Sequence, residues 1–101
     1  MLDQALLAGE TWTRSLGAAP RGSAASVWRR HASTVAAYRD RYYVVGSRTL
    51  GQPAQSTAQR QDERRALAAL GAAQRLAYGS HVDAATHRAA APSLPPMIHR
   101  L

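Results

Sequence analysis

The amino-acid sequence predicts an all-α fold of three to four helices, joined by short connections that are rich in glycine and proline. The first observation is composition: of 101 residues, 22 are Ala and 13 are Arg, and both are strong helix formers. The second is periodicity, because apolar and aromatic residues recur every three or four positions between residues 24 and 43. The third is the placement of Gly and Pro, which separate the periodic stretches.

The N-terminal part predicts one short helix followed by a linker. Residues 2–16 carry a loose helical stripe of apolar side chains, and Gly9 is expected to divide it. Residues 17–22 contain two Gly and one Pro, which oppose continuation of a helix. We therefore expect a linker between residue 17 and the next helix.

The clearest helix extends from Ala24 to about Tyr43, with Ser23 or Ser26 as its N-cap. Its apolar and aromatic positions are spaced 3, 4, 3 and 4 residues apart, so they share one face: Trp28, His31, Val35, Tyr38 and Tyr42. The β-branched pair Val44-Val45 and then Gly46 are expected to end this helix, with Gly46 in a left-handed conformation.

A third helix is predicted to begin at Ser56, because Gln59 stands three residues later as in a capping box. It should end at about Tyr78, before Gly79. Its expected inner face contains Leu67, Leu70, Gln74 and Ala77, flanked by Ala66 and Ala73.

Ser80 is expected to start a short fourth helix through Ala90, which Pro92 must stop. Residues 1–90 would then form a single small helical domain, or a fragment of a larger protein, and residues 91–101 a flexible proline-rich tail.

The predicted core is thin, because Ala buries little area per residue and large aliphatic side chains are few. The residues expected to form it are Trp12, Leu16, Trp28, Val35, Tyr38, Tyr42, Leu50, Leu67 and Leu70.

Charge and composition narrow the classes of function. The formal net charge of +7 favours polyanionic partners, with nucleic acid ahead of acidic membranes. The chain has no Cys, so disulfides, thiolate metal sites and cysteine nucleophiles are excluded. No apolar run approaches the roughly 18 residues of a membrane span, and Asp3 stands where a signal peptide needs a cation. The expected compartment is the cytoplasm, without membrane association.

One longer pattern resembles a known family. It comprises Trp12, Leu16-Gly17, Pro20, Trp28, the string Val-Ala-Ala-Tyr-Arg-Asp-Arg-Tyr at 35–42, and Leu50-Gly51 before an Arg/Ala-rich helix. This pattern, from about Trp12 to Leu70, resembles the C-terminal helical region of actinobacterial conjugative relaxases of the MobF class. Such relaxases join a DNA-nicking domain, with a catalytic Tyr and three metal-binding His, to a helicase with a phosphate-binding loop. The chain has no Lys, so it lacks the lysine of such a loop, and the resemblance implies only the non-catalytic part of these proteins.

Three residue patterns are candidates for a reactive site. Tyr42-Tyr43 could suggest a nicking nucleophile, but the spacing favours Tyr42 as a core aromatic residue and Tyr43 as a helix-end residue. Asp83 and His87 share a helix face that could hold a metal or form an ion pair, but they supply at most two ligands. No Gly-x-Ser-x-Gly motif supports a serine hydrolase. We therefore expect no enzymatic activity and no cofactor.

Arginine rows are the better candidate for a site. Arg30 and Arg41 are three helical turns apart, as are Arg64 and Arg75, and Arg60 lies near the second row. Such rows could follow a phosphate backbone without reading its sequence. The alternative is a solvated face, in which Asp62 pairs with Arg65 and Glu63 with Arg60.

Two functional hypotheses follow, and a third possibility is a gene fragment without an independent role. The first is a non-catalytic module that contacts the nucleic-acid backbone or docks on a larger relaxase or helicase of the DNA-transfer machinery. The second is a protein-interaction or structural module whose charge only provides solubility.

Overall fold

The computed structural model describes the backbone of residues 1–93 and the side chains of residues 1–79. It confirms the all-α class: within this part of the chain every regular element is helical. The elements are the α-helices α1 (Leu2–Ala8), α2 (Ser23–Arg41) and α3 (Thr57–Ser93), and the 3-10 helix η1 (Thr11–Leu16).

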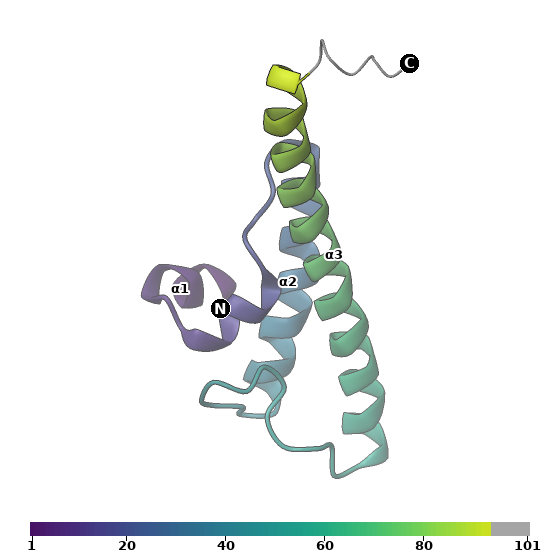
Figure 1. The fold of residues 1–101 in the computed structure, drawn as a ribbon. Coiled ribbons are helices and arrows are strands. Elements are labelled where there is room, and N and C mark those ends of the chain that lie inside the picture. Colours follow the sequence, from purple (N-terminus) through teal and green to yellow (C-terminus); the bar gives the residue numbers. More distant parts are fainter. Residues whose placement is uncertain (94–101) are drawn as a thin grey trace.

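Helices α2 and α3 form an antiparallel pair, and α1 lies against the side of α2 (Figure 1). Helix α3 has 37 residues and α2 has 19, so at about 1.5 Å per residue α3 is nearly twice as long. The C-terminal part of α3 therefore extends past the N-terminal end of α2 (Figure 1).

The N-terminal segment divides at Gly9, as the sequence predicts. Gly9 ends α1 in a left-handed conformation with φ 66°, and its N–H donates to the Leu6 carbonyl. The next N–H, of Glu10, donates to the Ala5 carbonyl, which completes a Schellman motif. The linker at residues 17–22 then leads into α2.

Both ends of α2 differ from the prediction. Its N-cap is Gly22, without a side-chain hydrogen bond, so neither Ser23 nor Ser26 caps it. The Ser26 hydroxyl donates instead to the Ser23 carbonyl, one turn back within the helix. At the other end the helix stops at Arg41 rather than about Tyr43.

Tyr43 explains this early end of α2. It has φ 52° and occupies the left-handed position that glycine usually takes after a helix. Its N–H donates to the Asp40 carbonyl at 3.4 Å, and the Val44 N–H donates to the Arg39 carbonyl at 2.9 Å. These two bonds define a Schellman motif, so the chain leaves the helix before it reaches Gly46.

The predicted start of α3 is confirmed. The Ser56 hydroxyl accepts a hydrogen bond from the Gln59 backbone N–H at 3.0 Å. The Gln59 side chain reaches back to accept from the Gln55 N–H at 3.2 Å, one residue before the position of a standard capping box.

The predicted break near Gly79 is wrong, because α3 continues without interruption to Ser93. Gly79 does not adopt a positive φ, and a single helical glycine costs only about 1 kcal/mol relative to alanine. Ser80 therefore starts no separate helix, and Pro92 lies within the last turn of α3. Of the predicted tail, residues 91–93 belong to α3, and residues 94–101 lie outside the described part.

The core forms where α2 meets α1, η1 and α3. Trp12, Leu16, Trp28, Val35 and Tyr38 are buried as predicted, and Tyr42, Leu50 and Leu70 are half-buried at its edge. The indole N–H of Trp28 donates to the Leu16 carbonyl at 3.2 Å, which ties α2 to η1.

The predicted inner face of α3 is rotated. Leu67 is 52% exposed, and between residues 57 and 79 the buried positions of this helix are all alanines: Ala66, Ala69, Ala73 and Ala77. Small side chains let the backbones approach closely, and a Cβ added to Gly17 would lie only 2.6 Å from the Ala77 Cβ. The predicted inner residue Gln74 lies at the exposed edge, where its side-chain amide donates to the Ser15 carbonyl at 2.8 Å.

Candidate functional site

The arginine row on α3 lies on the side of the helix that faces away from the buried alanines. At about 100° per residue, Arg64 and Arg75 are turned by about 160–180° from Ala66, and Arg60 lies nearby. We call this side the outer face of α3, and its exposed members are Thr57, Arg60, Gln61, Arg64, Leu67, Ala68, Arg75 and Tyr78.

The outer face of α3 carries no acidic side chain between residues 57 and 79. The two acids in that stretch, Asp62 and Glu63, are half-buried near the α2-facing side. None of Arg60, Arg64 and Arg75 forms an ion pair within the described part of the chain, so the predicted Arg60–Glu63 pair is not found there. With respect to the described side chains, the donors of these three guanidinium groups are therefore open to a ligand.

The arginine row on α2 lies elsewhere. Arg30 and Arg41 are exposed on the flank of α2 that borders α3, together with Thr34 and Ala37. Arg65 of α3, which was not among the predicted site residues, lies on the same flank. The structure therefore does not bring the two predicted rows onto one surface.

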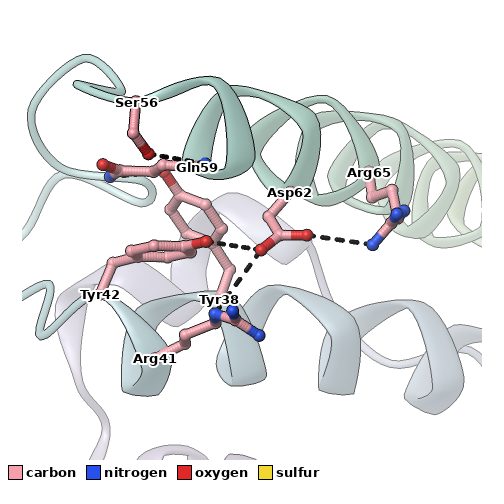
Figure 2. Close-up of polar contacts among 7 residues, drawn as sticks. All are labelled: Tyr38, Arg41, Tyr42, Ser56, Gln59, Asp62 and Arg65. Atoms are coloured by element: carbon pink, nitrogen blue, oxygen red, sulfur yellow. Dashed lines mark hydrogen bonds and ion pairs between the residues drawn. The ribbon is translucent and has the colours of Figure 1, made fainter.

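Asp62 is the centre of a polar cluster between α2 and α3 (Figure 2). Its Oδ2 accepts a hydrogen bond from the Tyr42 hydroxyl at 2.5 Å and lies 3.7 Å from Arg41 Nε. Its Oδ1 accepts from Arg65 Nη1 at 3.0 Å, which confirms the predicted pair. A second link joins the same helices, because the Gln59 amide donates to the Tyr38 hydroxyl at 3.1 Å.

The Tyr42 hydroxyl is engaged in the link between α2 and α3. The hydrogen bond to the Asp62 carboxylate raises the pKa of the Tyr42 hydroxyl, because it stabilises the neutral phenol, and desolvation adds to this. Tyr43 points away from this cluster, into solvent, and is 88% exposed.

The described part of the chain contains no group of three or more metal-ligating side chains. That part does not include the side chains of Asp83, His87, His81 and His99. A metal contact or an ion pair formed by Asp83 and His87 therefore stays a prediction. In the same residues no helix is both long enough and apolar enough to cross a membrane.

Arg39 is a structural arginine that the sequence did not distinguish from the others. It is buried, and its guanidinium donates to the carbonyls of Arg48, Thr49 and Gly46 at 2.7, 2.9 and 3.1 Å. The group also lies 4.6 Å from the centre of the Trp12 ring. Its contacts hold the loop after α2 against the core, so Arg39 is not available to a ligand.

Comparisons with protein-family models, with curated proteins and with solved structures found no match. The resemblance to conjugative relaxases therefore rests on the sequence pattern alone.

Proposed function

We propose that this chain is a non-catalytic helical module that contacts the phosphate backbone of nucleic acid through the outer face of α3. The observation that carries the proposal is the set of three exposed arginines on this face, none of them paired with an acid within the described residues. A polyanion gains charge-assisted hydrogen bonds from each of them without first displacing a carboxylate.

The spacing of the row suits a backbone ligand. Arg64 and Arg75 are separated by three turns, a rise of about 16 Å, so they can contact different phosphates of one strand. Arginine binds phosphate whatever base is attached, so we expect binding that does not depend on sequence. The resemblance to the relaxase tail is compatible with this role, as part of a larger DNA-processing protein or beside one.

The test compares two triple variants with the same loss of charge. Arg60→Gln, Arg64→Gln and Arg75→Gln together remove the proposed contacts, whereas Arg14→Gln, Arg21→Gln and Arg48→Gln remove three exposed arginines elsewhere. Fluorescence anisotropy with a labelled duplex at about 50 mM salt should show a loss of roughly tenfold or more in the first variant and a much smaller loss in the second. Equal losses would contradict the proposal, because net charge alone would then explain binding.

A protein-docking module is the second candidate, and one observation favours it. Leu67 and Tyr78 are exposed on the same outer face of α3, by 52% and 70%. Exposed apolar side chains beside arginines are common at the centre of protein interfaces. For this function, Leu67→Ser with Tyr78→Ser would abolish capture of a protein partner. If the chain is a docking module, the wild type should also bind nucleic acid only negligibly at about 150 mM salt.

A further inference from the structure

We infer that the pocket between α2 and α3, beside the Asp62 cluster, is a binding site for a phosphate group. This site lies on the flank of the helix pair and not on the outer face of α3. It therefore does not depend on the proposed contact with a nucleic-acid backbone.

The pocket is small and has walls from both helices. It has a volume of about 190 Å³ and is lined by Thr34, Ala37, Tyr38, Arg41, Tyr42, Asp62 and Arg65. Pockets for drug-sized ligands hold roughly 300–1,000 Å³, and one water in the liquid occupies about 30 Å³. The space therefore suits a single small group with a few waters.

Two guanidinium groups at this pocket share one carboxylate. Arg41 and Arg65 both pair with Asp62, so the three charges leave a net positive charge at the pocket. Asp62 is held in place, since its side chain is only 23% exposed and it accepts from the Tyr42 hydroxyl. Figure 2 shows this carboxylate between the two guanidinium groups.

Most donors of the two arginines remain free for a ligand. Arg41 approaches Asp62 through Nε and lies over the Tyr42 ring, and within the described residues its terminal nitrogens form no ion pair. Arg65 uses Nη1 alone. Each guanidinium has five N–H donors in a planar fork that matches two oxygens of an oxyanion. The Thr34 hydroxyl donates to the Arg30 carbonyl at 3.2 Å, so it is not counted as a donor.

A phosphate group fits this charge and donor pattern best. A tetrahedral dianion offers oxygens to both forks at once, whereas a carboxylate carries one charge and two oxygens. A cation is disfavoured, because Asp62 is already compensated by two arginines. Free phosphate and a phosphate ester both present negatively charged oxygens to the two arginines of this pocket.

The test is a titration with inorganic phosphate at constant ionic strength, followed by NMR of the backbone amides of the whole chain. We expect saturable shifts confined to residues 34–42 and 62–65. Arg41→Gln with Arg65→Gln should abolish them, whereas Arg14→Gln with Arg21→Gln, which removes the same charge, should leave the affinity within about twofold. Because both pocket arginines are largely exposed, circular dichroism should show an unchanged fold.

Asp62→Asn provides the second variant. The amide keeps an acceptor for Tyr42 but removes the competing negative charge, so phosphate should bind several-fold more tightly. Absence of saturable shifts, equal loss in the two double variants, or weaker binding to Asp62→Asn would each overturn the inference. A nucleoside 5′-monophosphate that binds tenfold more tightly than inorganic phosphate identifies an ester as the ligand, and one that binds tenfold more weakly identifies free phosphate.

The two proposals fail separately. The Arg60, Arg64 and Arg75 triple variant should retain the phosphate shifts if the pocket is the site. If those shifts disappear with the outer-face arginines, the pocket is not the phosphate site, whatever the result for nucleic acid.

Discussion

The arginines of this chain have different roles, and Arg39 shows this most clearly. Burial lowers the pKa of its guanidinium, and the nearby Glu10 carboxylate raises it in part. The group remains charged, because arginine is not deprotonated in proteins, and three carbonyls accept its hydrogen bonds. One of the 13 basic side chains thus stabilises the fold, so the formal charge of +7 overstates what a ligand can contact.

Tyr43 permits a direct test at the residue scale. Its left-handed conformation costs an L-residue about 1–2 kcal/mol, whereas glycine adopts it freely, and its side chain is 88% exposed. We expect Tyr43→Gly to raise the free energy of unfolding by about 0.5–1 kcal/mol, after the entropy of the glycine is counted.

Urea denaturation measures this change, and Tyr43→Ala is the control. Alanine removes the same ring but keeps the strain, so it should not stabilise the protein. A glycine variant no more stable than the alanine variant would show that the Schellman turn after α2 is not strained at this position.

Sequence pattern predicted the residues of α2 better than those of its ends. The spacing from Trp28 to Tyr38 identified a buried face correctly, because large side chains leave a clear 3.6-residue period. The role of Arg39 had no such signal, since its carbonyl partners belong to a loop without regular structure. The end of α2 was misplaced because a tyrosine takes a position at which glycine is expected.

At the scale of elements, α3 packs through alanines, and Gly17 lies close to one of them, Ala77. Gly17 has φ 78°, and a new Cβ would lie 2.6 Å from the Ala77 Cβ, which is too close for any real contact. Gly46 has φ 90° with open space around it, so a Cβ added there meets no neighbouring atom within 4 Å.

We therefore expect Gly46→Ala to destabilise the protein by about 1 kcal/mol and Gly17→Ala by at least about twice as much. Chemical denaturation of the two variants checks this difference. Equal losses would mean that η1 and α3 can separate at no cost, and that the alanine face is not tightly packed.

The contact between Tyr42 and Asp62 predicts a pH dependence of the helix pair. The folded state raises the pKa of Tyr42 above its ordinary value of 10.0, chiefly through the hydrogen bond to Asp62. The stabilisation is therefore fully present below about pH 10 and is lost as the pH rises through the folded-state pKa.

Unfolding should be followed from pH 8 to 11 in the wild type and in Tyr42→Phe, which lacks the titrating group. The stability advantage of the wild type should shrink across the alkaline part of this range. An advantage that stays constant with pH would show that the hydrogen bond is not formed in solution.

The rotation of the buried face of α3 could not be predicted from the sequence, for a physical reason. Leu67 and Leu70 are large apolar residues in a stretch made mostly of alanine and polar residues, so periodicity favours them as the core. The close approach at Gly17 and the polar links from Gln59 and Asp62 to α2 instead place the alanines inside. The candidate site changed with this rotation: the α3 row faces solvent, and Arg65 joins the α2 row.

At the scale of the whole molecule, two basic surfaces lie on different sides of the α2–α3 pair. Within the described residues the arginines on the outer face of α3 pair with no acid, whereas the flank arginines Arg41 and Arg65 share Asp62. A backbone ligand should prefer the first surface, because binding at the second must compete with a carboxylate.

The salt dependence of duplex binding tests this account most directly. Each phosphate contact contributes a slope of about −0.9 to a plot of log affinity against log salt concentration. The variant that lacks Arg60, Arg64 and Arg75 should have a slope shallower than the wild type by about 2–3, because three contacts are lost. The variant that lacks Arg14, Arg21 and Arg48 should change it by less than about 1. The same change of slope in both variants would contradict a defined site on the outer face of α3.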